Sequence, residues 1–204
     1  TTGGRKRTPS CSPEKRSAMQ ARLDAMNQLS DRFAGLGRGM LNRALPEDPR
    51  EEATPPAIYQ LKITLRHLAP PVWRRVQVPN DITFGQLHDV IQTAMGWYNC
   101  HLHEFRVGEA RFGMTHDPMG GPLERNDALD ENDYQLCGLG LRAKSKFNYE
   151  YDFGDDWEHQ IVLEKVLPLE PGFAPICVAG SRAGPAEDSG GPWGYAEKLA
   201  ILAN

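Results

Sequence analysis

The chain has 204 residues, 40% of them hydrophobic, and a formal net charge of −4 at pH 7. It contains no apolar run of the roughly 18 residues that a membrane-spanning helix needs, and no apolar stretch of a secretory signal follows its basic N-terminus. The four cysteines form no CxxC pair, which argues against a zinc finger or a dense disulfide framework and favours a reducing, cytoplasmic setting.

The N-terminal part of the chain is basic, whereas the rest is acidic. Residues 1–43 hold nine Lys and Arg against three Asp and Glu, a net +6, so the remaining residues carry −10 to reach −4. Such an arm can contact the phosphates of nucleic acid, although a solvated extension is the simpler interpretation. We therefore predict a basic, partly helical extension and a Pro- and Glu-rich linker over residues 1–57.

One amphipathic helix is predicted within this extension. Apolar side chains recur there at helical spacing and form one narrow stripe: Met19, Leu23, Met26 and Phe33. A stripe of this kind is typical of a docking face, either onto the chain's own domain or onto a second copy in a homodimer.

A folded domain is predicted over residues 58–204. Thr83 and Gln86 form a capping-box pattern that begins a helix ending near Met95, and His88 at the edge of its apolar stripe is expected to be a hydrogen-bonded structural residue. Strands are predicted at 58–66, 72–78, 102–107, 109–114, 147–152 and 157–166, and a final helix from Pro192. This order predicts an α+β fold, a largely antiparallel sheet with one main covering helix in a β-grasp-like order.

Residues 149–159, YEYDFGDDWEH, combine aromatic residues with carboxylates in a predicted hairpin. Matching the apolar faces of the two strands pairs Phe153 with Trp157 and leaves a three-residue turn in which Asp156 takes a left-handed conformation. In this register His159 opposes Tyr151.

The same register places Asp152 opposite Glu158. Opposed carboxylates are unfavourable unless solvent or a cation lies between them. That cation could be Arg74 or Arg75, or it could be a divalent metal ion with hard oxygen ligands.

The stretch Cys100-His101-Leu102-His103-Glu104 is a second candidate site. On a strand, the two histidines share a face and could chelate one transition-metal ion, but they could equally be ordinary residues of a partly buried face. The candidate metal ligands are Asp152, Asp155, Asp156, Glu158, His159, His101 and His103. No GxSxG, GxxxxGK[ST] or strand-linked GxGxxG motif is present, so no catalytic residue and no organic cofactor are predicted.

Six stretches carry a family resemblance: IYQLKITL, PPVWRRVQVP, ITFGQLHDVIQTAMGW, HLHEF, YEYDFGDDWEH and PAEDSGGPWGY. Through residues 58–196 the chain resembles the plasmid Ri ORF-three-like family, whose members include TnpR-labelled passenger proteins of an insertion element. The resemblance implies a compact α+β domain associated with plasmids and mobile elements, without an established activity. The label suggests a resolvase, but the sequence has no serine-recombinase-like arrangement.

Two departures from the family pattern affect what the resemblance implies. Similar proteins often carry cysteines in the tail, where this chain has Gly184 and Ser189 near Cys177, so a cysteine metal site is not expected there. Relatives also tend to continue past the final helix, which predicts an incomplete C-terminus.

Together these features predict a non-enzymatic, cytoplasmic binding module with a protein or nucleic-acid partner and no membrane contact. Nucleic acid would be contacted through residues 1–43. The alternative is a metal-dependent hydrolase or nuclease, in which the acidic hairpin 152–159 holds a divalent ion and His159 or His103 is the general base. This alternative requires Asp155 and Asp156 to approach the histidines around one concave pocket.

Overall fold

The computed structural model describes residues 54–115 and 128–202, all within one compact unit of the chain, Glu51–Asn204. The predicted N-terminal helical extension lies outside the described residues. In chain order the elements are β1 (Ala57–Leu65), β2 (Trp73–Pro79), α2 (Phe84–Met95), β3 (His103–Val107), β4 (Ala110–Gly113), β5 (Leu129–Asp130), the 3-10 helix η1 (Leu136–Leu139), β6 (Lys146–Tyr151), β7 (Trp157–Pro168), β8 (Ile176–Ser181) and α3 (Gly191–Leu202).

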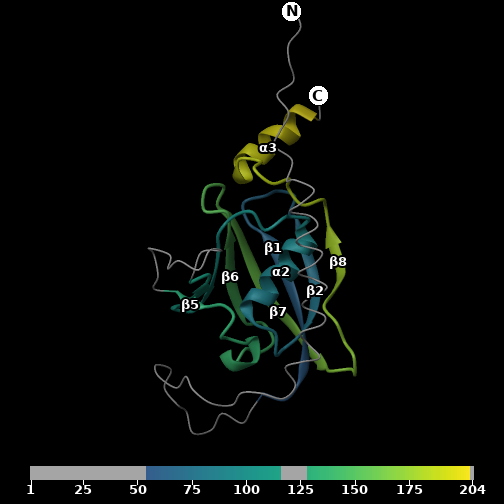
Figure 1. Ribbon diagram of the computed structural model, residues 1–204. Coiled ribbons are helices and arrows are strands. Elements are labelled where there is room, and N and C mark those ends of the chain that lie inside the picture. The colour runs from purple at the N-terminus through teal and green to yellow at the C-terminus, as the bar shows by residue number, and fades with distance from the viewer. Residues whose placement is uncertain (1–53, 116–127, 203–204) are drawn as a thin grey trace, which may run out of the picture. The chain divides into compact units, whose positions relative to one another are not determined.

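One eight-stranded sheet forms the frame of the domain, in the order β5-β4-β3-β6-β7-β1-β2-β8 (Figure 1). All neighbouring strands are antiparallel except β4 and β5. The predicted α+β class with a largely antiparallel sheet is therefore confirmed. The predicted β-grasp-like order is not supported, because β1 lies between β2 and β7 and is antiparallel to both.

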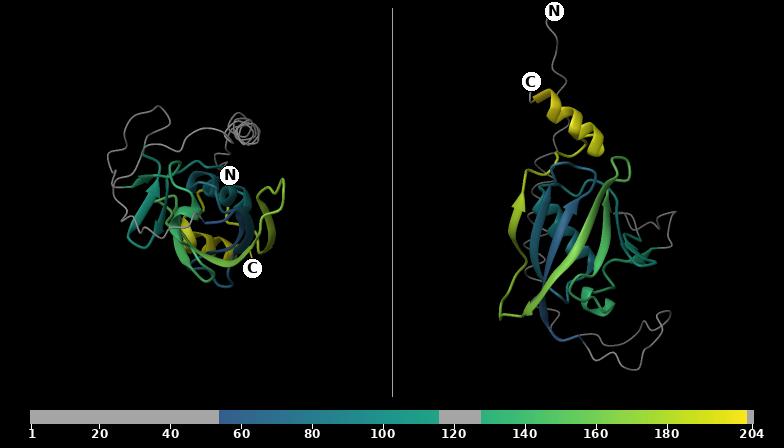
Figure 2. Two further views of the ribbon diagram at one scale, coloured as in Figure 1. Left: turned by 90° about the horizontal axis from the view of Figure 1, so that it is seen from below. Right: turned by 180° about the vertical axis from the view of Figure 1, so that it is seen from behind.

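Helix α2 covers one face of the sheet, and the view from behind shows no helix of residues 54–115 or 128–202 over the other face (Figure 2). The predicted capping box is present: the Thr83 hydroxyl accepts from the Gln86 N–H at 3.2 Å, and the Gln86 side chain accepts from the Thr83 N–H at 2.9 Å. The helix ends at Gly96, whose φ of 84° is a left-handed conformation that glycine adopts without strain.

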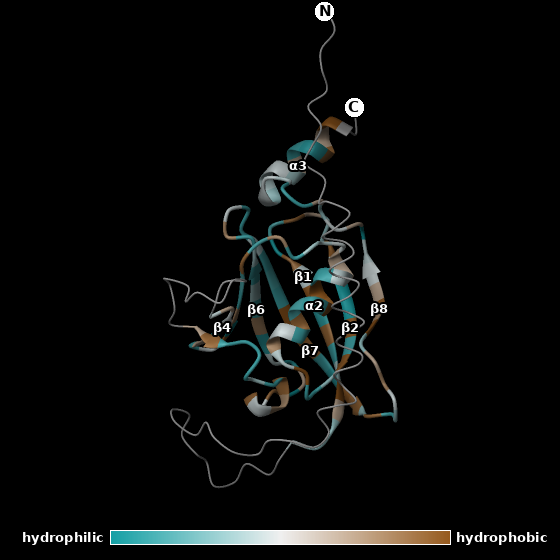
Figure 3. Ribbon diagram, viewed as in Figure 1, coloured by the Kyte–Doolittle hydropathy of each residue, from teal (hydrophilic) through white to brown (hydrophobic). Residues whose placement is uncertain are grey.

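The hydrophobic core lies between α2 and the sheet. Hydrophobic and hydrophilic residues alternate along the central strands (Figure 3), as a sheet covered on one face requires. Phe84 at the start of α2 stacks on Phe112 with ring centroids 4.3 Å apart and meets Phe105 at 5.0 Å. The uncovered face carries charged side chains, among them the bidentate pair of Arg75 with Glu164.

The β6–β7 hairpin differs from its predicted register by two residues. Tyr151, not Phe153, opposes Trp157, so the turn spans residues 152–156 instead of three residues. A shift of two keeps every side chain on its predicted face, because the side-chain period of a strand is two. Asp156 has the predicted left-handed conformation, with φ 52°, but Asp152 also adopts one, with φ 58°, and this lengthens the turn.

After β7 the tail returns along the sheet edge as β8 and then passes the end of α2 to reach α3. Gly184 lies so close to α2 that an added Cβ would stand 2.2 Å from the carbonyl oxygen of Met95. Next to it, the Trp97 indole N–H donates to the Pro185 carbonyl at 2.8 Å. No helix in the two described ranges is long and apolar enough to cross a membrane.

The close approach of Gly184 to α2 gives the first testable prediction. We expect Gly184→Ala to lower the free energy of unfolding by about 1–3 kcal/mol, the usual cost of overpacking a close contact. Gly138→Ala is the matched control, since an added Cβ there meets no atom within 4 Å. Urea denaturation measures both, and equal stabilities of the two variants would contradict the prediction.

Candidate functional site

The end of the sheet that carries the β6–β7 turn brings together three segments distant in sequence. Asp152 comes from this turn, His101 from the loop before β3, and Glu187 and Asp188 from the segment before α3. Nε2 of His101 lies 3.2 Å from Asp188 Oδ1, 3.5 Å from Asp152 Oδ2 and 3.8 Å from Glu187 Oε2. His101, Asp152 and Asp188 each offer one ligand atom, and these atoms lie within 4.8 Å of one another.

Two of the carboxylates, Glu187 and Asp152, are held in place by hydrogen bonds to the oxygen that does not face His101. Oε1 of Glu187 accepts from the Tyr98 N–H at 2.8 Å and from the Tyr151 hydroxyl at 2.9 Å. Burial raises the pKa of Tyr151, so its hydroxyl stays protonated and donates. Oδ1 of Asp152 accepts from the Gly154 N–H at 3.0 Å. The second oxygen of each carboxylate is thereby turned toward His101.

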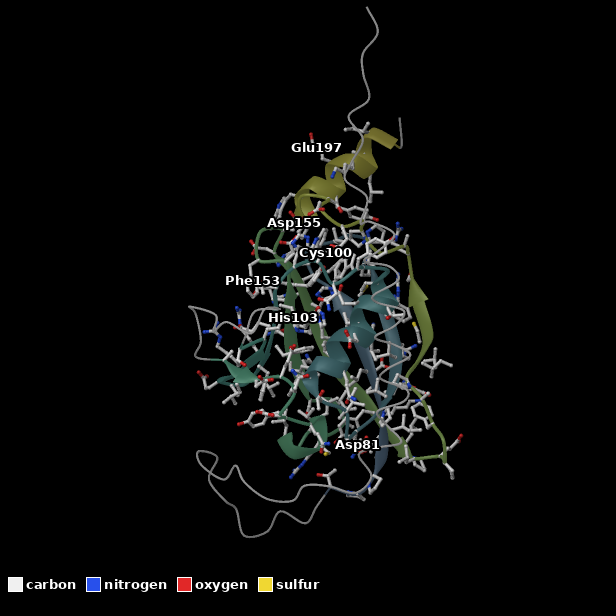
Figure 4. The ribbon with its side chains drawn as sticks, viewed as in Figure 1. Asp81, Cys100, His103, Phe153, Asp155 and Glu197 are labelled. Carbon is white, nitrogen blue, oxygen red and sulfur yellow. The ribbon has the colours of Figure 1, made fainter. Side chains whose placement is uncertain are left out.

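The other two aspartates of the turn do not join this cluster. Asp155 Oδ2 accepts from the Gly190 N–H at 2.9 Å and so ties the turn to the start of α3. Asp156 is exposed. Figure 4 shows Asp155, Phe153 and Cys100 at this end of the sheet, next to the start of α3.

His103 lies elsewhere, beside α2 in the core (Figure 4). Its ring stacks on His88 with centroids 3.4 Å apart, and its Nε2 is 2.5 Å from Glu131 Oε2. Burial lowers the pKa of each of these histidines to about 3 and raises the pKa of Glu131 to about 7. His101 and His103 therefore face different surroundings, and the structure does not bring them together as one chelating pair.

His88 is a hydrogen-bonded structural residue, as predicted. Its Nδ1 lies 2.8 Å from the Tyr149 hydroxyl, which also accepts from the Gln92 side chain at 3.1 Å. Helix α2 is thus joined to β6 through polar contacts inside the core.

His159 is completely buried on the aromatic face of β7. It opposes Tyr149 and not Tyr151 as predicted, and its Nδ1 lies 3.3 Å from the Tyr149 carbonyl oxygen. Burial lowers its pKa to about 4, so the ring is neutral at pH 7. Neither His159 nor His103 can reach a solvent-exposed substrate.

The opposed carboxylates of the hairpin are Glu150 and Glu158, because the register differs from the prediction. Arginines lie beside both: Arg106 Nη2 is 2.9 Å from Glu150, and Arg66 Nη1 is 3.2 Å from Glu158. The predicted partners Arg74 and Arg75 lie elsewhere. Arg75 pairs with Glu164, and Arg74 donates to the carbonyls of Ala94 and Trp73 at 2.7 and 2.9 Å.

Sequence reasoning did not identify Glu187 and Asp188 as candidates. The only local signal is a pair of adjacent carboxylates in PAEDSGGPWGY, just before the helix predicted from Pro192. That stretch meets HLHEF and YEYDFGDDWEH at the site, so three of the six stretches that carry the family resemblance converge here.

Comparisons with known proteins agree with that resemblance. The family model described as plasmid pRiA4b ORF-3-like protein matches residues 57–204. The uncharacterized protein y4hQ of Sinorhizobium fredii is 42% identical over 149 residues, which cover 72% of this chain and 74% of the relative. The crystal structure of MM3350, a protein of unknown function from Methanosarcina mazei, is similar with a TM-score of 0.64 and 38% identity, over 73% of this chain and 83% of that chain.

Proposed function

The chain belongs to the plasmid pRiA4b ORF-3-like family, and we propose that it is a non-enzymatic module that binds a protein partner. The descriptions of the two similar proteins name no activity, so the proposal is argued from the surface of this chain. The observation that carries this proposal is the exposed apolar surface of α3.

Helix α3 extends beyond the end of the sheet (Figure 1). Residues 196–201 are all exposed, with Ile201 at 67% and Leu199 at 44%. Trp193 is 71% exposed, and its indole stacks on His67 with centroids 5.8 Å apart. Exposed apolar groups gathered on one element are typical of interaction sites, and tryptophan is a frequent anchor of protein interfaces.

The charges near α3 favour a protein over a nucleic acid. Asp155 lies near the start of the helix and Glu197 on it (Figure 4), and Asp188, just before it, has a side chain that is 61% exposed. Carboxylates repel the phosphates that supply most of the affinity for nucleic acid. Contact with nucleic acid through residues 1–43 stays a separate prediction.

The hydrolase or nuclease alternative is not favoured. Its general base was to be His159 or His103, and both rings are buried in the core. Asp155 accepts from the Gly190 N–H instead, and neither Asp155 nor Asp156 lines the pocket that His159 borders together with Glu150 and Glu158.

We also propose that the module acts in the cytoplasm on behalf of a plasmid or other mobile element. The family description supports the plasmid association. Cys137 and Cys177 are free thiols, which suits a reducing compartment.

Site-specific photocrosslinking in cells tests the proposed surface. A photoreactive amino acid at Leu199 is expected to form an adduct with a protein, and the double substitution Trp193→Ala and Ile201→Ser is expected to abolish that adduct. The same probe at Val166, which is 50% exposed on β7, is the control. A second copy of this chain in the adduct would identify the partner as a homodimer.

Two results would overturn the proposal. The first is an adduct with nucleic acid in place of protein at Leu199. The second is equal adduct yields at Leu199 and Val166, which would show that α3 is not a selective docking surface.

A further inference from the structure

We propose that His101, Asp152 and Asp188, with Glu187 beside them, form a binding site for one divalent first-row transition-metal ion. This inference goes beyond the proposed partner binding and rests on the geometry at the end of the sheet.

The distances between the ligand atoms suit such an ion. An ion about 2.1 Å from each of four ligand atoms in a tetrahedron holds those atoms about 3.4 Å apart. The carboxylate oxygens lie 3.2, 3.5 and 3.8 Å from His101 Nε2. The ligand atoms of His101, Asp152 and Asp188 also lie within 4.8 Å of one another, so small side-chain adjustments are enough to place these three around one ion, with Glu187 beside them.

The site also has an outer layer that orients its ligands. Glu187 and Asp152 each use one oxygen for hydrogen bonds to the protein and direct the other toward His101. Their side chains are only 12% exposed. Hydrogen bonds of this kind fix the ligands of metal sites before the ion binds.

The need for a cation follows from His101 itself. Among the described residues, its Nε2 is one of the buried side-chain nitrogens that have no hydrogen-bond partner of regular geometry, although three carboxylates lie close to it. Converging carboxylates repel one another unless a positive charge lies between them. A metal ion supplies that charge and also uses the nitrogen lone pair, whereas the competing explanation is a protonated imidazole.

The donor set indicates the class of ion. One imidazole nitrogen with carboxylate oxygens suits Zn²⁺ or Mn²⁺, whereas Mg²⁺ and Ca²⁺ prefer oxygen ligands alone. The bound ion would join the loop before β3, the β6–β7 turn and the segment that leads into α3.

Calorimetric titration of the full chain with Zn²⁺, followed by elemental analysis after dialysis, tests the site. We expect one equivalent of Zn²⁺ at micromolar protein, no binding of Mg²⁺ at the same concentration, and a higher thermal unfolding midpoint with Zn²⁺. Asp188→Asn and His101→Gln should each weaken Zn²⁺ binding by about 100-fold or more, since each removes a direct ligand.

Asp156→Asn is the matched control. It removes the same charge as Asp188→Asn, but at an exposed residue of the β6–β7 turn outside the cluster, and should leave Zn²⁺ binding unchanged. Because Asp188 is largely exposed, its variant is expected to fold, and a circular dichroism spectrum checks this. Absence of stoichiometric Zn²⁺ and Mn²⁺ in the wild type, or equal loss of binding in Asp156→Asn, would overturn the proposal.

Discussion

Trp97→Ala is expected to lower the free energy of unfolding by about 3–5 kcal/mol, the range for truncating a buried aromatic side chain. The indole is only 1% exposed. It stacks on Tyr151 with centroids 4.9 Å apart and meets His159 edge-on at 5.3 Å. Removing it leaves a cavity between α2 and the β6–β7 hairpin, beside the candidate metal site.

Trp97 also holds the tail, because its N–H donates to the Pro185 carbonyl. Trp97→Phe separates the two roles: it keeps an aromatic ring but leaves that buried carbonyl unpaired, at a cost of about 1–3 kcal/mol. Urea denaturation gives the free energies of unfolding of both variants. Limited proteolysis of the tail that follows Pro185 should be faster in both variants than in the wild type.

Trp193→Ala is the control for this prediction. Trp193 is 71% exposed, so its removal is expected to change the free energy of unfolding by less than about 0.5 kcal/mol. A loss of similar size in Trp97→Ala and Trp193→Ala would show that the core around Trp97 contributes far less than its packing indicates.

Local pattern was enough to predict much of the fold. Alternating apolar residues placed β1, β6 and β7 correctly, and the Thr83–Gln86 pair identified the start of α2. The alternation of apolar and polar residues did not predict β8, because most of its side chains are exposed and its sequence therefore does not alternate. The hairpin register was missed by two residues, since a shift of two leaves the pattern of apolar faces unchanged and cannot be detected from it.

The candidate site was less predictable, because it depends on where the tail docks. The sequence identified His101 and Asp152 but could not show that Glu187 and Asp188, more than 30 residues further on, return to meet them. It also could not show that His103 points to Glu131. Such contacts are set by the packing of distant segments and leave no local periodicity.

The second large effect is a loss of stability in mild acid. Three buried histidines have lowered pKa values, about 3 for His88 and His103 and about 4 for His159, because burial disfavours the charged ring. In the unfolded chain each titrates near its ordinary pKa of about 6.5. Their contribution to stability is therefore complete above pH 6.5 and is lost as the pH falls toward 4.

Glu131 acts in the opposite direction. Burial raises its pKa to about 7, so the folded protein holds this proton over a range in which the unfolded chain, with a pKa of about 4.5, releases it. Its contribution is complete below about pH 4.5 and is lost as the pH rises through 7. Between about pH 6.5 and 4.5 the unfolded state thus binds about three more protons at the histidines and one fewer at Glu131.

The unfolded state therefore binds a net excess of about two protons. The free energy of unfolding is expected to fall by about 3 kcal/mol for each unit by which the pH is lowered in this range. Urea denaturation at steps between pH 7.5 and 5, with a chelator present to keep metal ions away from His101, measures this slope. A profile that is flat between pH 6.5 and 5 would contradict the assignment of neutral buried rings.

Glu131→Gln isolates the opposing contribution. The amide keeps the shape of the carboxyl group and can still hydrogen-bond to His103 Nε2, but it does not titrate. The difference between the two states then rises to about three protons, so the slope should steepen to about 4 kcal/mol per pH unit. An unchanged slope would mean that Glu131 is ionised in the folded protein, and the positive charge that balances it would then have to lie on the His88–His103 pair.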